Sequence, residues 1–97
     1  MDKRIGALYP FPLETGFEAK EGMQGDFVML LQIVLNEIRL FNDRYPPLLV
    51  SGIYGKEVSL AVKEVQKLSA LPKTGNTDSA TWNSIAMQYN LAQKSGQ

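Results

Sequence analysis

The sequence predicts an all-α fold, a compact three-helix bundle with long glycine-containing loops and an extended N-terminal arm. Three segments repeat apolar residues at the spacing of a buried helix face. Glycine and proline gather between these segments, where they break helices and favour turns. The 97 residues, 44% of them hydrophobic, suffice for one core but not for two. We therefore divide the chain into an arm over residues 1–25, a three-helix domain over 26–90 and a frayed tail over 91–97.

The N-terminal arm is predicted to be extended because prolines and glycines interrupt it throughout. It also carries several apolar side chains, at Leu8, Tyr9, Phe11, Leu13 and Phe17. A free tail of this composition would expose much apolar surface to water. We therefore expect the arm to pack along the helical domain.

The first helix is predicted over residues 26–41, with Asp26 as its N-cap. Asn42 and the Tyr45-Pro46-Pro47 segment end it, since proline disfavours helix in the residue before it. The apolar face of this helix is expected to contain Phe27, Leu31, Val34, Leu35, Ile38 and Phe41.

The second helix is predicted over residues 56–70, after a short extended stretch at 48–50 and a turn containing Gly52 and Gly55. Leu71-Pro72 ends it. Its buried side is marked by Val58, Ala61, Val62, Val65, and either Leu68 or Ser69.

The third helix follows a second turn, Thr74-Gly75-Asn76, and is predicted to reach about Asn90. Either Thr77 or Asp78 can cap it, because both side chains carry an oxygen that can accept from the first free backbone amides. Its inner face is expected to contain Trp82, Ile85, Ala86 and Tyr89.

An internal repeat links the helices and turns. Val28-x-x-Leu31-Gln32 aligns with Val62-x-x-Val65-Gln66, and the turn at 51–58 aligns with that at 74–81. Each unit is a helix with an apolar-Gln pair followed by a glycine turn, and the two units share the middle helix. We expect Gln32 and Gln66 to reach the backbone of the following turn, since an amide offers two donors and an acceptor. At Gly52 and Gly75 glycine permits positive φ or a close backbone approach.

Composition excludes several classes of function. The chain has no cysteine and no histidine, so it offers no disulfide, no thiolate nucleophile, no Cys/His zinc site and no histidine base. The formal net charge is zero, whereas nucleic-acid binders carry a basic excess. The carboxylates follow no pattern that places two of them in one apolar pocket. We expect no catalytic site, no metal and no cofactor.

Targeting segments are not expected either. The most apolar run, FVMLLQIVL, is too short to span a membrane and is broken by Gln32. The first 13 residues contain two prolines and no small-residue cleavage site, so we predict no signal peptide here.

The ordered motifs resemble one family. They run from Tyr9-Pro10 through Val28-x-x-Leu31-Gln32, Gly52-Ile53-Tyr54-Gly55, Ala61-Val62-x-x-Val65-Gln66 and Leu71-Pro72-x-Thr74-Gly75 to Thr81-Trp82-Asn83-x-Ile85. This series resembles the peptidoglycan-binding domain of the three-helix type, a targeting module beside cell-wall hydrolases. The resemblance implies a non-catalytic module that binds the glycan or the stem peptide of peptidoglycan. It implies a place in the cell wall or outside the cell, as part of a longer or separately exported protein, with a hydrolase domain or another chain as further partner.

The resemblance also implies a shallow groove near the glycine turns and the helix starts that they feed. The ligand-binding candidates there are Ser51, Gly52, Tyr54, Gly55, Asp78, Thr81 and Trp82. Trp82 could stack on a sugar, but its helical spacing favours the core. Tyr54 fits ligand contact and packing equally well. Gln32, Gln66 and Gly75 are interpreted as bracing the turns.

Four positions depart from the family pattern. Ser51 stands in place of an aspartate, Val58 of a threonine, Val65 of an aromatic residue and Ala70 of a glycine. Loss of a carboxylate and a hydroxyl near the groove favours an alternative function. In that alternative the same fold is a structural or protein-interaction module that has lost wall binding.

Overall fold

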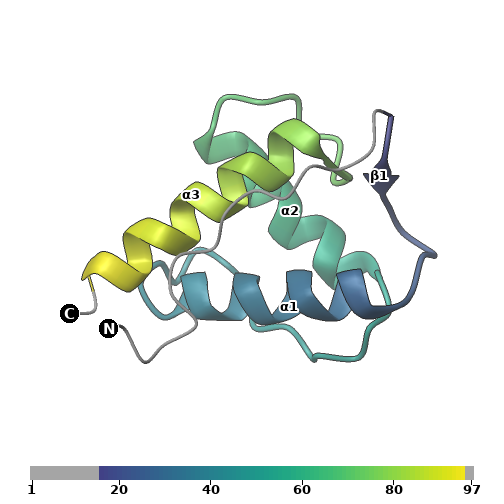
Figure 1. Ribbon diagram of the computed structural model, residues 1–97, viewed down its shortest axis with the longest axis horizontal. Coiled ribbons are helices and arrows are strands. Elements are labelled where there is room, and N and C mark those ends of the chain that lie inside the picture. Colours follow the sequence, from purple (N-terminus) through teal and green to yellow (C-terminus); the bar gives the residue numbers. More distant parts are fainter. Residues whose placement is uncertain (1–15, 96–97) are drawn as a thin grey trace, which may run out of the picture.

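The computed structural model describes residues 16–95, and for 93–95 the backbone alone. It contains the helices α1 (Asp26–Arg39), α2 (Lys56–Leu68) and α3 (Ser79–Ser95), as predicted for an all-α three-helix bundle (Figure 1). Two short strands, β1 (Glu18–Ala19) and β2 (Thr77–Asp78), add a sheet that the sequence did not predict. The expected packing of the arm over residues 1–15 lies outside the described residues.

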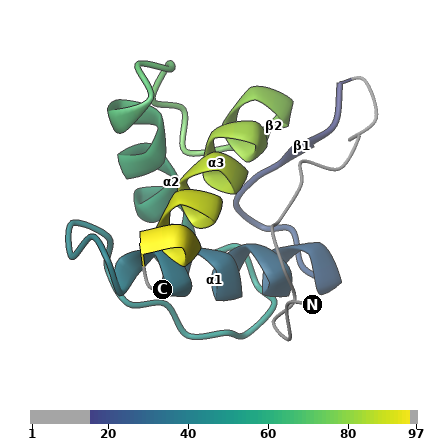
Figure 2. The ribbon, with the colours of Figure 1, turned by 60° about the vertical axis from the view of Figure 1, so that its left-hand side comes forward.

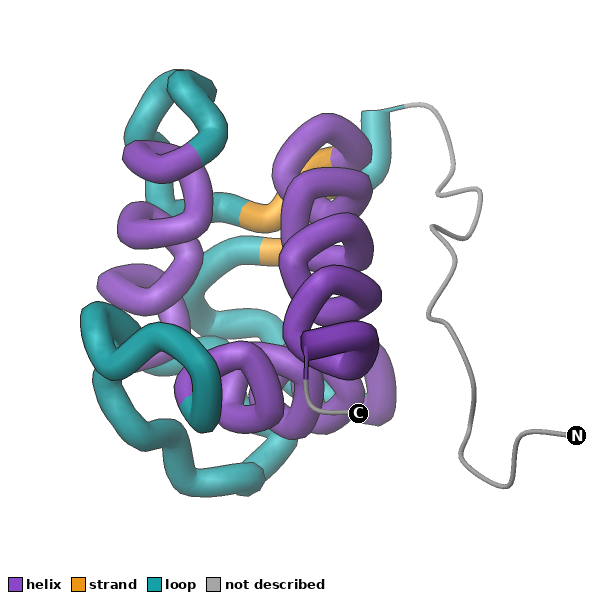
Figure 3. The backbone as a smooth tube through the Cα atoms, turned by 90° about the vertical axis from the view of Figure 1, so that its left-hand side faces the viewer, coloured by secondary structure: helices purple, strands orange, loops and turns teal. Residues whose placement is uncertain are grey.

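The three helices enclose one core. Figure 3 shows α2 and α3 standing beside each other, with α1 running across one end of the pair. The largest fully buried side chains come from all three helices and from the loops between them, and include Trp82, Tyr45, Tyr54, Leu31, Leu35 and Ile85. Trp82 is completely buried, and its ring lies 5.2 Å from that of Phe27 between ring centroids. Burial of apolar side chains of this size is the main term that stabilises such a small domain.

Helix α1 begins at the predicted residue, but its N-cap differs from the prediction. Gly25 occupies the N-cap position with φ 136°, and no side chain caps the helix. Asp26 is instead the first helical residue, where its charge interacts favourably with the helix dipole.

The C-terminal end of α1 also corrects a prediction. The helix ends at Arg39, so the helical spacing no longer applies at Phe41. The Phe41 side chain is 51% exposed and does not belong to the apolar face. Leu31, Val34, Leu35 and Ile38 are buried as predicted.

Helix α2 ends at Leu68, before the predicted end at Ala70. Ala70 has φ 57° and cannot continue a right-handed helix. Its amide donates to the Lys67 carbonyl, and the Leu71 amide donates to the Gln66 carbonyl over 2.8 Å. These two bonds form a Schellman motif, which satisfies the last helical carbonyls. Leu68 is exposed and Ser69 only half-buried, so the buried side of α2 ends with Val65 and Gln66.

Helix α3 begins after Asp78, whose carboxylate accepts from the Thr81 amide over 2.9 Å. Of the two caps that the sequence allowed, Asp78 therefore acts. The helix continues to Ser95, past the predicted end at Asn90. Ala92 is buried in the added turns, so packing extends the helix into the residues expected to form a tail.

The segment before α1 contacts both glycine turns. Strand β1 pairs antiparallel with β2, with Glu18 opposite Asp78 and Ala19 opposite Thr77, at the start of α3 (Figure 2). Further along, the Gly22 amide donates to the Tyr54 carbonyl, and the Tyr54 amide donates to the Met23 carbonyl. Residues 18–19 thus pair with the strand that follows the second turn, and residues 22–23 bond to Tyr54 in the first turn.

The described helices bear on the prediction that no apolar segment is long enough to span a membrane. None of the helices within residues 16–95 combines the length and the apolar character needed to cross a bilayer.

Candidate functional site

The first glycine turn is held by Gln32 of α1. The Gln32 Oε1 accepts from the Gly52 amide over 2.8 Å, and its Nε2 donates to the Ile53 carbonyl over 3.1 Å. The same Nε2 lies 3.3 Å from Ser51 Oγ. The glutamine side chain is 1% exposed, so these bonds form away from water.

The second turn is held in the same way by Gln66 of α2. Its Oε1 accepts from the Gly75 amide over 2.9 Å, and its Nε2 donates to the Asn76 carbonyl over 2.9 Å. The Nε2 also contacts the hydroxyls of Thr74 and Thr81, each at 3.1 Å. The two aligned units of the sequence therefore have the same hydrogen bonds from a glutamine to the following turn. They differ at the start of the next helix, where Val58 occupies the position at which Thr81 supplies a hydroxyl.

The turn glycines share one backbone conformation. Gly52 has φ 80° and Gly75 has φ 81°, in the left-handed region that side chains disfavour. A Cβ at Gly75 would also overlap Ser59 Oγ of α2. At the second turn, both the backbone conformation and the close packing of Gly75 therefore favour glycine.

Tyr54 connects the two turns. Its hydroxyl donates to the Gly75 carbonyl over 2.6 Å and lies 3.1 Å from Thr77 Oγ1. The side chain is 1% exposed. Burial of the phenol disfavours its charged form and raises the pKa of Tyr54 to about 12, partly offset by the hydrogen bond to Thr77. The Tyr54 side chain therefore has a structural role, because it links the first turn to the second.

The structure separates the seven ligand-binding candidates by accessibility. Tyr54, Thr81 and Trp82 have buried side chains, and Gly52 is buried as well. Ser51 and Asp78 are exposed, and Gly55 is half-buried. Only these last three can meet a ligand without rearrangement of the fold.

A groove of about 270 Å³ lies beside the first turn and the start of α2. Its rim consists of exposed residues and its floor of buried ones. The rim contains Pro47, Leu49, Ser51, Ile53 and Glu57, and the floor contains Gln32, Leu48 and Val58. Of the candidates from the sequence, Ser51 alone lines this groove.

The other rim residues were not singled out from the sequence. Leu49 and Ile53 read as ordinary loop residues, yet they are 83% and 52% exposed. No pattern in the sequence distinguished them from their neighbours Leu48 and Tyr54, which are buried. Glu57 lies in the first turn of α2, with its carboxylate close to Gly55.

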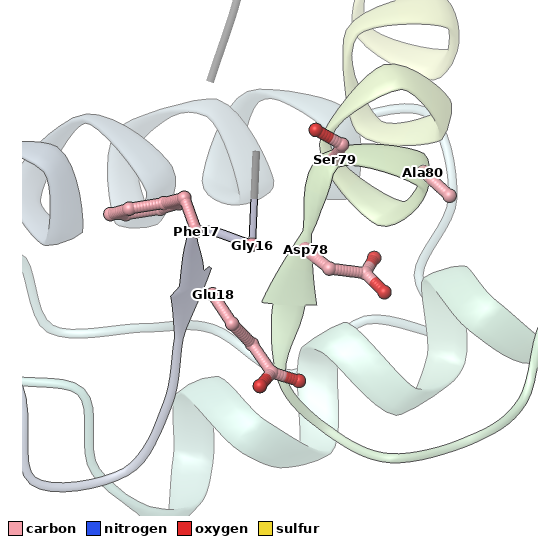
Figure 4. A pocket seen from close by; sticks show the side chains of 6 residues that line it. All are labelled: Gly16, Phe17, Glu18, Asp78, Ser79 and Ala80. Carbon is pink, nitrogen blue, oxygen red and sulfur yellow. The ribbon is translucent and has the colours of Figure 1, made fainter. Parts of the chain in front are cut away.

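A second hollow, of about 310 Å³, lies where β1 meets β2 and the start of α3 (Figure 4). Glu18 and Asp78 extend from the two strands on its border. Both carboxylates have local partners: Glu18 accepts from Asn76 Nδ2, and Asp78 caps α3. The hollow is more open than the groove at the first turn, and both of its carboxylates already make local hydrogen bonds. We therefore place the candidate site at the first turn.

Residues 16–95 contain no cluster of metal-ligating side chains. No group of three acidic, histidine or cysteine side chains in this part of the chain could hold a metal ion. Among the described residues that line the groove, Glu57 alone is a carboxylate, whereas glycosidic-bond hydrolysis commonly uses a pair.

Comparison with known proteins gave one family. The model of the family described as "Putative peptidoglycan binding domain" matches residues 24–85. The matched range covers more than half of the chain and includes α1, both glycine turns and α2. Searches of curated proteins and of solved structures gave no match.

Proposed function

The chain belongs to the peptidoglycan-binding domain family, and from this premise we propose that it is a non-catalytic module that attaches a partner to the bacterial cell wall. The partner is a wall hydrolase domain or a particle, in the same chain or in another. A tethered module raises the local concentration of its partner at the wall without any new chemistry. Its place of action is the cell wall or the space outside the cell.

The binding site in this proposal is the groove beside the first glycine turn. The observation that supports it is the combination of an accessible rim and a fixed floor. Gln32 makes three hydrogen bonds to the turn, which fix the position of its side chain in the floor. Preformed sites lose less conformational entropy on binding.

Sedimentation with insoluble peptidoglycan sacculi tests the function and the site together. We expect the purified chain to pellet with sacculi in a saturable manner. Leu49→Gln should weaken pelleting severalfold because Leu49 forms the exposed rim. Leu60→Gln is the matched control, since Leu60 is 50% exposed on α2 but does not line the groove. Circular dichroism checks that both variants fold.

Two results would contradict this proposal. If the folded chain does not pellet with sacculi of any chemotype, wall binding is wrong. If the Leu49 and Leu60 variants pellet alike, the function stands but the site lies elsewhere.

A protein-interaction module is the second candidate function, supported by a different surface. A hollow of about 210 Å³ between α1 and α3 is bordered by Phe41 and Leu91, which are 51% and 61% exposed. Exposed apolar side chains around a hollow are typical of protein contacts. Under this proposal the chain does not pellet with sacculi, and Leu91→Asp abolishes its self-association, measured by sedimentation velocity.

A further inference from the structure

The groove beside the first turn differs from a sugar site in its lining. Five of its eight lining residues are aliphatic, namely Pro47, Leu48, Leu49, Ile53 and Val58, and no aromatic ring from the part of the chain that the structure describes lines it. Sugars usually bind against the face of an aromatic ring, which offers apolar area and an electrostatic match to the C–H groups. The groove therefore lacks the surface that most favours a glycan.

The polar groups of the groove are also poorly suited to a polyhydroxylated ligand. The amide of Gln32 is fully engaged with Gly52, Ile53 and Ser51. The Ser51 hydroxyl already accepts from the Ile53 amide and from Gln32. The groove therefore offers a sugar few side-chain hydrogen-bonding groups that are not already engaged.

One group in the groove remains available for a charged ligand. Glu57 is exposed on the rim, and the only ion pair found among the described side chains of residues 16–92 is Arg44–Glu64, which does not involve it. An amine that reaches the groove can pair with this carboxylate. The aliphatic rim at Leu49 and Ile53 would contact the hydrocarbon chain that carries such an amine.

From these contacts we propose that the groove binds the peptide portion of the wall polymer, through a diamino-acid residue whose free side-chain amine pairs with Glu57. The inference rests on the proposed function, because it names which half of the polymer occupies the same site. The volume of about 270 Å³ agrees with it. Most ligand pockets measure about 300–1,000 Å³, so this groove holds a small part of a ligand, such as one side chain with its flanking backbone.

Soluble fragments of peptidoglycan, either peptide alone or glycan alone, distinguish peptide binding from glycan binding. The ¹⁵N-labelled chain is titrated with three probes: a stem peptide with a free diamino-acid side-chain amine, the same peptide with that amine acetylated, and peptide-free glycan strands. We expect the first peptide to shift the amide resonances of Leu49, Ser51, Ile53 and Glu57. Acetylation and Glu57→Gln should each weaken binding about fivefold, the upper range for an exposed ion pair. Asp43→Asn is the control for charge, since Asp43 is exposed and does not line the groove.

Three outcomes overturn the inference. The first is that glycan strands shift the groove resonances and the peptide does not. The second is that acetylation and Glu57→Gln leave peptide affinity unchanged. The third is that no probe shifts these resonances although the same sample pellets with sacculi; wall binding then stands and the peptide assignment falls. Failure to pellet at all contradicts the proposed function itself.

Discussion

Gln66 illustrates how single side chains hold this fold together. Its one amide contacts the backbone of Gly75 and Asn76 and two threonine hydroxyls. Backbone groups in a tight turn cannot join a helix or sheet ladder, so a side chain has to satisfy them. Since Gln66 is 1% exposed, water cannot take over when the amide is removed.

We therefore expect Gln66→Leu to lower the free energy of unfolding by about 2–4 kcal/mol, because it leaves the Gly75 amide and the Asn76 carbonyl without partners. Urea denaturation measures this. Gln24→Leu is the matched control: Gln24 is exposed, and its replacement should change stability by less than about 0.5 kcal/mol. Equal effects of the two substitutions would show that the amide does not hold the turn.

The contacts of single side chains were also the feature of the molecule that the sequence predicted least completely. The repeat predicted that Gln32 and Gln66 reach the turns, because two copies of one motif restrict what the amide can do. Nothing in the sequence distinguished a buried from an exposed Tyr54. Its burial depends on a partner at Gly75, 21 residues later, and a helical pattern carries no information on contacts across that distance.

At the scale of elements, α2 is followed by a residue whose type is unfavourable for its backbone conformation. A Schellman motif requires a left-handed residue, and here that residue is Ala70 with φ 57°. A left-handed conformation costs an L-residue roughly 1–2 kcal/mol, whereas glycine adopts it freely. The Ala70 side chain is exposed, so it gains nothing from packing in return.

Ala70→Gly should therefore stabilise the chain, by about 0.5–1 kcal/mol once the greater entropy of glycine in the unfolded state is included. The midpoint of urea denaturation would rise. Ala80→Gly is the control: Ala80 is exposed in the first turn of α3, and glycine there should destabilise the chain rather than stabilise it. A destabilised Ala70→Gly chain would contradict the left-handed assignment.

The elements themselves were largely predictable. Helices α1 and α2 start at the predicted residues, Asp26 and Lys56, because each follows a glycine that ends the preceding turn. The helix ends were less accurate, since tertiary packing and left-handed residues decide them. Strands β1 and β2 could not be predicted, because two residues are too few to show an alternating pattern.

At the scale of the whole molecule, two buried tyrosines make stability depend on pH. Burial raises the pKa of both Tyr45 and Tyr54 from 10.0 to about 12. The unfolded chain therefore releases these protons near pH 10, while the folded chain retains them to about pH 12. Their contribution to stability is complete below pH 10 and is lost as the pH rises from 10 to 12.

Urea denaturation across pH 8–11.5 measures this loss. We expect Tyr54→Phe to lower stability at pH 8 by about 1–2 kcal/mol, through loss of the hydrogen bonds to Gly75 and Thr77. Its stability should then fall less steeply above pH 10 than that of the unaltered chain, because one of two such groups is gone. Parallel curves above pH 10 would mean that the Tyr54 hydroxyl does not titrate with unfolding.

The pairing of β1 with β2 has a consequence for synthesis. Glu18 on β1 contacts Asn76, 58 residues further along the chain. A ribosome adds about 5–20 residues per second, so β1 is made roughly 3–12 seconds before its partner. During that interval α1, the first turn and α2 can assemble, but Tyr54 has no acceptor for its hydroxyl. The fold of the described residues is therefore completed only after β2 has been made and can pair with β1.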